Sequence, residues 1–138
     1  MAKTEKIFVG KKLVGIKIKS MQKGSHPVTD DGGALQVLTL KHDKGAHVAP
    51  HYHQGTKRVT QTLQECLVVL KGKICIAIYG AKKTPVRSIT VRAGEAYIVL
   101  AGAIGVRYLE DSEVLETKNG PFKNDTVKLY LASERKQH

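Results

Sequence analysis

The chain has 138 residues, of which 41% are hydrophobic, and its formal net charge is +11 at pH 7. This length and apolar content predict one packed domain, residues 1–138, rather than a disordered chain. No apolar run approaches the roughly 20 residues of a membrane-spanning helix. The N-terminus carries lysines but lacks the apolar stretch and cleavage site of a signal peptide. We therefore expect a cytoplasmic protein without membrane contact.

Almost all predicted elements are strands. Alternation of period two and short apolar runs recur between Gly, Pro, Asn and Asp, whereas apolar residues at helical spacing are nearly absent. Short strands separated by turn residues are typical of an all-β sandwich or barrel. The predicted strands, in chain order, are Leu13–Lys19, Leu35–His42, His47–His53, Glu65–Leu70, Ile74–Tyr79, Arg87–Val91, Ala96–Leu100, Val106–Glu110, Val114–Lys118 and Lys128–Ala132.

Residues 1–33 are interpreted as an N-terminal arm of one or two strands. Lys23–Gly33 is rich in Gly, Pro and Asp and separates this arm from a predicted β-barrel core, residues 34–132, and a polar tail, residues 133–138. Residues 1–24 contain seven lysines and one acidic residue. A solvated, edge-protecting strand face explains them better than a nucleic-acid surface, because no nucleic-acid motif accompanies them. Charge is therefore the only feature of the sequence that suggests nucleic-acid binding. Attraction of anionic small molecules by these lysines is an alternative that stays open.

The middle of the chain predicts a hairpin that is buried on both faces. Glu65–Leu70 and Ile74–Tyr79 are apolar at successive positions and flank a turn at Lys71–Gly72–Lys73. Cys66 and Cys75 are then expected to be buried thiols on adjacent strands. Glu65 would stand at the mouth of the core, where a carboxylate needs a partner such as a metal ion or Arg58.

Two histidines upstream suggest that partner. His51 and His53 are two residues apart, so on a strand both side chains leave the same face. With Glu65 from a neighbouring strand they predict ligands for a divalent metal ion, namely Fe, Mn, Ni, Co or Zn. The residues proposed to supply a further ligand are His47, Gln61 and Gln64. Two alternatives stay open: a proton shuttle between Glu65 and His53 without metal, and a polar pocket without chemistry.

The spacing of these residues resembles the first motif of the cupin superfamily. Gly45 is followed by five residues and then His51-Tyr-His53, and Glu65 is followed by six residues and then Gly72. The eleven residues between His53 and Glu65 form a longer spacer than is usual in the family. This implies an enlarged loop over the mouth of the barrel.

Two further stretches carry the resemblance. Gly94-EAYIV-Leu-Ala-Gly102 is similar to the second cupin motif in its glycines, but Gly105 stands where the family has its fourth ligand, a histidine. ETKNGPFKNDTVKL, residues 116–129, is similar to the end of small cupins associated with polysaccharide and nucleotide-sugar biosynthesis.

The resemblance implies a double-stranded β-helix, or jelly roll, that forms a homodimer. It also implies a metal site at His51, His53 and Glu65, and a small ligand, anionic or sugar-like, inside the barrel. The protein would then be a metal-dependent isomerase or oxygenase, or a non-catalytic binding protein.

Overall fold

The structure is a computed structural model that describes residues 3–81 and 83–129, and it is all-β, as the sequence predicts. No helix of the length and apolarity needed to cross a bilayer is present among these residues. The strands are β1 (Lys3–Val9), β2 (Lys12–Ser20), β3 (Gly24–Pro27), β4 (Leu38–Lys41), β5 (Glu65–Lys71), β6 (Lys73–Tyr79), β7 (Pro85–Arg92), β8 (Ala96–Val99), β9 (Ile104–Tyr108) and β10 (Glu113–Lys118).

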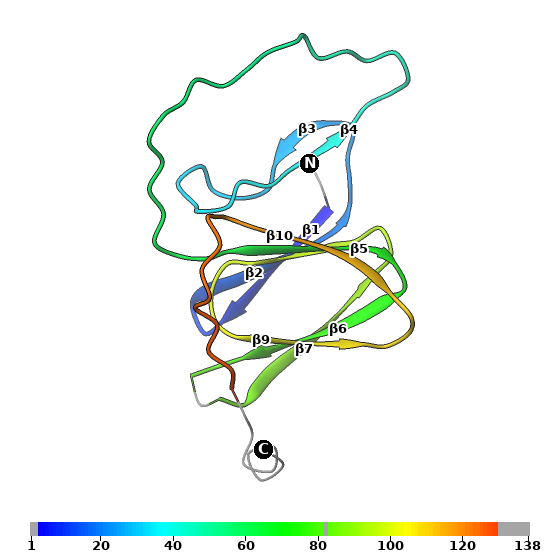
Figure 1. Cartoon of the computed structure of the whole chain (residues 1–138). Coiled ribbons are helices and arrows are strands. Elements are labelled where there is room, and N and C mark those ends of the chain that lie inside the picture. Colours follow the sequence, from blue (N-terminus) through cyan, green and yellow to red (C-terminus); the bar gives the residue numbers. More distant parts are fainter. Residues whose placement is uncertain (1–2, 82, 130–138) are drawn as a thin grey trace.

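The strands form three antiparallel sheets (Figure 1). The largest has the order β1-β2-β8-β5-β10, the second has the order β7-β6-β9, and the third pairs β3 with β4. The two larger sheets face each other and bury the main core between them, which includes Val69 and Tyr97 from one sheet and Ile76 from the other. The protein is therefore a two-sheet sandwich with a small additional hairpin.

The five-stranded sheet is covered on both faces. Alternate residues of β5 divide between two clusters, because successive side chains of a strand point to opposite faces. Leu67 and Val69 join the main core, whereas Cys66 joins a second cluster with Ile16 and Ile98. Residues that flank the β3–β4 hairpin pack against this second cluster. The sequence prediction that β5 is apolar on both faces therefore holds over Cys66–Val69, but Leu70 is exposed.

The prediction of a hairpin between β5 and β6 is wrong. These strands belong to different sheets, so the turn at Gly72 is a corner of the sandwich and Cys66 and Cys75 do not lie on paired strands. Gly72 has φ +84°, and a Cβ built there would lie 2.3 Å from Ser112 Oγ. The Ser112 hydroxyl also accepts a hydrogen bond from the Lys73 amide at 3.0 Å. Close packing of two turns therefore sends the chain from one sheet to the other.

The predicted strands that correspond to β2 and to β5 through β10 are confirmed within two residues at each end. The strand predicted over Leu35–His42 is shorter, because the backbone amides of Leu35 and Val37 donate to the side chains of Gln64 and Thr29 rather than to a neighbouring strand. Strand β3 lies inside the stretch interpreted as a linker. Of the strand predicted over Lys128–Ala132, residues 128 and 129 form no strand, and residues 130–132 lie outside the described residues.

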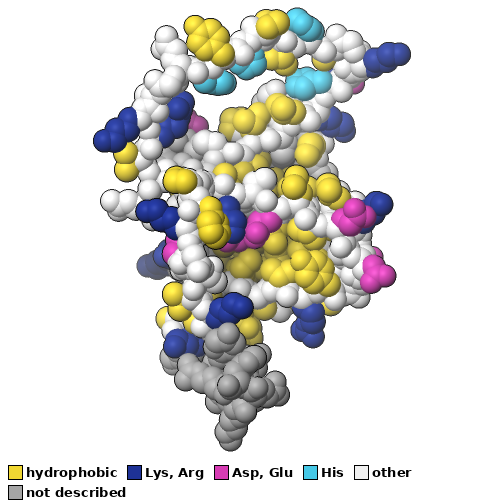
Figure 2. Space-filling model, viewed as in Figure 1, with side chains coloured by type: hydrophobic (Ala, Val, Ile, Leu, Met, Phe, Trp, Pro, Cys, Tyr) yellow, Lys and Arg dark blue, Asp and Glu magenta, His cyan; other side chains and the backbone are white. Residues whose placement is uncertain are grey.

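The strand predicted over His47–His53 is also wrong. No strand occurs between the end of β4 and the start of β5, and the chain arcs away from the sandwich there (Figure 1). Pro50 has no N–H to donate to a ladder, and no partner strand lies beside it. Tyr52, between the two histidines, is 85% exposed. Histidine side chains are visible along this part of the molecule in Figure 2. We call Lys44–Val59 the projecting segment.

Candidate functional site

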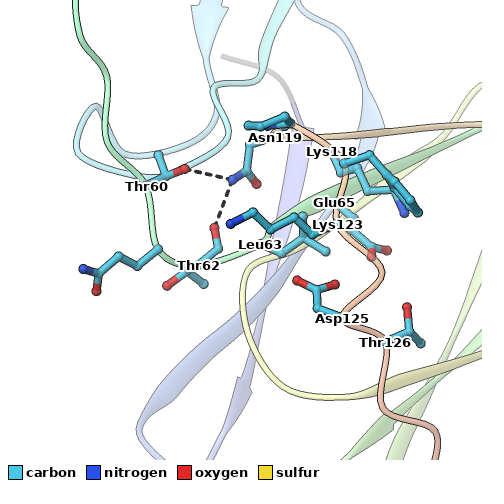
Figure 3. Close-up of a pocket in the computed structure, with 13 residues that line it drawn as sticks. Thr60, Thr62, Leu63, Glu65, Lys118, Asn119, Lys123, Asp125 and Thr126 are labelled. Atoms are coloured by element: carbon cyan, nitrogen blue, oxygen red, sulfur yellow. Dashed lines mark hydrogen bonds between the residues drawn. The ribbon is translucent and has the colours of Figure 1, made fainter.

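A cleft of about 680 Å³ lies at one end of the sandwich (Figure 3). One wall is the end of the loop that enters β5, and the other is the chain that leaves β10. Nine of the thirteen lining residues have polar side chains, which carry hydroxyl, amide, carboxylate or amine groups, and apolar atoms form about half of the exposed lining. The lining residues are Thr60, Gln61, Thr62, Leu63, Glu65, Lys118, Asn119, Gly120, Pro121, Phe122, Lys123, Asp125 and Thr126.

Asn119 ties the two walls together. Its Nδ2 group donates hydrogen bonds of 3.1 Å to Thr60 Oγ1 and to the carbonyl of Thr62 (Figure 3). Its Oδ1 accepts a hydrogen bond of 2.8 Å from the backbone amide of Gln64. The Gln64 side chain is also engaged, since Oε1 accepts from the Leu35 amide and Nε2 donates to the Leu100 carbonyl. Gln64 was predicted as a further metal ligand, and here it positions the wall of the cleft.

Glu65 is the predicted site residue that lies in the cleft. It is the first residue of β5 and lies on the same face as Leu67 and Val69, so it stands where the apolar core gives way to the opening. Lys118 lies directly opposite Glu65 in the β5–β10 ladder, and Glu116 lies opposite Leu67. Directly opposite residues share a face, so Glu65, Glu116 and Lys118 occupy the same side of the sheet.

This arrangement raises the pKa of the Glu65 carboxyl above its ordinary value. Burial is the largest cause, followed by a hydrogen bond to the Glu116 side chain and by repulsion from its charge, while the charge of Lys118 opposes the shift. The Lys118 amine is also 3.7 Å from Glu116 Oε2. The neighbouring Glu116 carboxyl therefore favours the protonated form of Glu65, and the Lys118 amine moderates this effect. Arg58, proposed from sequence as a partner of Glu65, instead donates to the Thr56 carbonyl at 3.4 Å.

The structure does not bring His51 and His53 to Glu65. Both histidines lie exposed on the projecting segment, and neither lines the cleft. Their rings meet edge to face with centroids 5.5 Å apart, and His51 Nδ1 donates to the Ala49 carbonyl at 2.8 Å. Among the described residues, no group of three or more His, Cys, Asp or Glu side chains is arranged to hold a metal ion. In this structure His51, His53 and Glu65 are therefore not arranged as a three-ligand metal centre.

The remaining sequence candidates are also separated from one another. His47 lies on the projecting segment and Gln61 lines the cleft. Gly105 is on β9, where an added Cβ would lie 3.5 Å from the Tyr79 ring.

Sequence reasoning missed the contribution of the chain around the end of β10. Glu116, Lys118, Asn119 and Asp125 complete the surroundings of Glu65. The alternation Glu116-Thr-Lys118 on a predicted strand was the available signal, because it places a carboxylate and an amine on one face. Their proximity to Glu65 depends on the β5–β10 pairing, which no local pattern specifies.

Comparisons with known proteins found no match among family models, curated proteins or solved structures. The site is therefore interpreted from its own geometry and chemistry.

Proposed function

We propose that this chain is a small-ligand-binding protein of the cupin type, and that the cleft at Glu65 holds a polyhydroxylated, sugar-like molecule. The observation that carries the proposal is the lining of the cleft, which combines carboxylates, amines, amides and hydroxyls beside one exposed aromatic ring. The motif spacing around Glu65 supports the cupin assignment. Two facing antiparallel sheets, between which the chain passes repeatedly from β5 to β10, support a jelly roll.

The size and polarity of the cleft suit a sugar. A volume of about 680 Å³ lies within the range of small-molecule sites. Hydroxyl groups of a ligand can both donate to Glu65 or Asp125 and accept from Lys118 or Lys123. The Phe122 ring is 82% exposed at the edge of the cleft and offers an apolar surface for the face of a sugar ring.

Charge favours a neutral ligand over an anionic one. The lining contains two acidic side chains, Glu65 and Asp125, and two basic ones, Lys118 and Lys123, so its formal charge is zero. Although the whole chain carries +11, the cleft itself does not concentrate positive charge. A phosphate or carboxylate group on the ligand would therefore gain little from the lining as a whole.

Glu65 could add chemistry to binding. A carboxyl with a raised pKa can keep its proton at a pH where ordinary carboxyls have lost theirs, and can then donate it to an oxygen of a bound ligand. Glu116 stabilises the protonated form through the shared hydrogen bond. The enzymatic version of the proposal is therefore acid–base catalysis on the sugar by Glu65, and the alternative is binding without turnover.

The metal hypothesis stays a second proposal. The proximity of the two imidazole rings, 5.5 Å between centroids, favours capture of a metal ion by the pair once their orientation adjusts. A site that also includes Glu65 requires the projecting segment to move to the cleft. Elemental analysis of protein purified without chelator, compared with His51→Ala/His53→Ala, tests this. Equal, near-zero metal content in both proteins would overturn it.

Titration of the protein with glucose, galactose, N-acetylglucosamine and glucose 1-phosphate, followed by heteronuclear NMR, tests the sugar proposal. We expect saturable shifts at Phe122, Lys123 and Asp125 with at least one neutral sugar, and affinity about tenfold weaker in Glu65→Gln, as for the loss of a hydrogen bond to a charged group. Glu113→Gln is the control, because Glu113 lies on β10 but outside the lining. Absence of saturable shifts with every sugar would overturn the proposal.

A further inference from the structure

In the part of the chain that the structure describes, the sandwich has an open side between β9 and β10. These strands are the outermost strands of their sheets, and they follow one another in the chain, so the two unpaired edges lie near each other (Figure 1). An unpaired edge presents free backbone N–H and C=O groups that can accept another strand. The opposite edges, β1 and β7, are bridged by an ion pair in which Arg87 contacts Glu5 Oε2 at 2.7 Å.

Apolar side chains of β9 on the face toward the main core reach the surface on this open side. Val106 and Tyr108 lie opposite Ile76 and Ile74, which are fully buried between the sheets. Because opposite residues share a face, Val106 and Tyr108 also point toward the interior, yet they are 39% and 61% exposed. Figure 2 shows apolar side chains gathered in this region, with acidic groups at its margin. No described strand of the chain covers β9 from this side.

The projecting segment has the composition of the strand that would cover it. Every residue of Lys44–Val59 is exposed and none is in a strand. Val48 and Tyr52 are 74% and 85% exposed, and because they are four residues apart they would share one face if the segment became extended. Both residue types favour strands.

The charges of the two surfaces are complementary. The projecting segment contains three basic residues, Lys44, Lys57 and Arg58, and no acidic residue. The span from β9 to β10, residues 104–118, contains four acidic residues and two basic ones, and no basic residue lies from 109 to 113, which include Glu110, Asp111 and Glu113. Glu113 is already paired with Lys71 at 3.1 Å, so Glu110 and Asp111 are the acidic groups proposed to meet the segment. Opposite charges at an interface steer association and set register.

Hydrogen bonds hold the chain on both sides of the projecting segment, and the segment points away from the open side of the same chain. Before it, Ser25 Oγ and His42 Nε2 form a hydrogen bond of 3.1 Å. After it, Asn119 holds Thr60 and Thr62 at the wall of the cleft. Between these anchors the segment arcs over the side of the molecule that carries the β3–β4 hairpin (Figure 1). If the sixteen residues run outward and then back, the tip of the segment can extend about 25 Å from its two ends, at roughly 3.3 Å per residue.

We propose that the projecting segment of one copy of this chain docks as an added strand on the open side between β9 and β10 of a second copy. Reciprocal exchange makes a two-fold symmetric dimer, in which each segment covers the other copy's Val106 and Tyr108. Docking on the chain's own open side would require release of the anchors at His42 and Thr60, whereas exchange with a second copy leaves them in place. The inference does not depend on the ligand of the cleft.

Light scattering of the full chain after size-exclusion chromatography tests the oligomeric state. We expect a dimer of two 15.1 kDa chains that dissociates on dilution and in high salt. A protein that stays monomeric at every concentration and at low salt would overturn the proposal.

Charge reversal identifies the contact. Glu110→Lys/Asp111→Lys and Lys57→Glu/Arg58→Glu should each weaken dimerisation by about tenfold or more, because each places like charges opposite one another. An equimolar mixture of the two variants should form a heterodimer, since both exchanged contacts are again attractive. Lys3→Glu/Lys11→Glu is the control, because both lysines lie on the β1–β2 hairpin and its turn, away from the open side. Absence of heterodimer from two folded variants would refute this contact.

Cysteine cross-linking distinguishes exchange from docking within one chain. A mixture of Val48→Cys and Tyr108→Cys chains should give a disulfide-linked heterodimer under mild oxidation, and Val48→Cys mixed with Lys11→Cys should not. In the double variant Val48→Cys/Tyr108→Cys, a cross-linked monomer as the main product would show that the segment docks on its own chain, which would overturn the proposal. The unsubstituted chain is the control for any cross-link formed by the native cysteines, Cys66 and Cys75.

Discussion

The projecting segment Lys44–Val59 and strand β5 both contain residue types that favour strands, but they have opposite environments. Cys66, Leu67 and Val69 of β5 are nearly inaccessible to solvent, whereas Val48 and Tyr52 are largely exposed. Strand β5 has β8 on one side and β10 on the other, and the segment has no paired strand. The difference teaches that a strand-like sequence becomes a strand only where neighbours complete its backbone hydrogen bonds and cover its apolar face.

The largest expected effect tests whether the sandwich carries the stability of the protein. Ile76 is fully buried between the two larger sheets. Ile76→Ala should lower the free energy of unfolding by about 3–4 kcal/mol, because a cavity is left among residues that cannot close it. Val48→Ala in the projecting segment should change it by less than about 0.5 kcal/mol when measured where the chain is monomeric. Urea denaturation of both variants provides the measurement, and equal losses would contradict the comparison.

The next effect concerns glycine in the two regions. Gly72→Ala should cost about 2–3 kcal/mol, because the residue has φ +84° and a Cβ would lie 2.4 Å from the Asp111 carbonyl oxygen. Gly55 in the projecting segment has no atom within 4 Å of an added Cβ, so Gly55→Ala should leave the melting temperature nearly unchanged. Thermal unfolding followed by circular dichroism compares the two. A stable Gly72→Ala protein would show that the β5–β6 corner is not this tightly packed.

A smaller effect, a gain in stability, is expected when a buried polar group is removed. The Tyr97 side chain is fully buried, its hydroxyl has no hydrogen-bond partner, and burial raises its pKa to about 12. Tyr97→Phe should therefore stabilise the protein by about 1 kcal/mol, because it removes an unsatisfied hydroxyl from the core. Tyr52→Phe in the projecting segment is the matched control and should be neutral in the monomer. A loss of stability in Tyr97→Phe would indicate that the hydroxyl has a partner.

The smallest effect depends on pH. Because folding raises the pKa of Glu65 above 4.5, the folded state favours the protonated form and loses stability as pH rises through that raised pKa. Glu65→Gln removes this loss. Its melting temperature should match that of the original protein near pH 4 and exceed it by about 1–3 °C near pH 7, a small effect because the site is partly solvated.

Thermal unfolding across this pH range measures the difference. Glu113→Gln serves as the control, because Glu113 is exposed at the sheet edge with Lys71 at 3.1 Å. A difference for Glu65→Gln that shrinks as pH rises would contradict the assigned direction.

Part of the candidate site could be predicted from the sequence. Glu65 opens an apolar run, and its place at the mouth of the core follows from alternation along β5. The two histidines were assigned to a strand because His51 and His53 alternate with Tyr52. That assignment is wrong, because the segment that contains them has no paired strand. Alternation shows which side chains share a face, but it does not show whether a partner strand exists.

The amino-acid sequence by itself determined the all-β class and the positions of β2 and of β5 through β10, because these depend on local alternation and on turn residues. Only the tertiary structure decided that β5 and β6 lie in different sheets, that Lys118 lies opposite Glu65, and that the open side falls between β9 and β10. The physical reason is that strand pairing joins residues far apart in the chain, and its free energy comes from burial and hydrogen bonds that no short stretch contains. The tertiary fold therefore determines which residues surround Glu65, whereas the position of Glu65 at the mouth of the core could be inferred from the sequence.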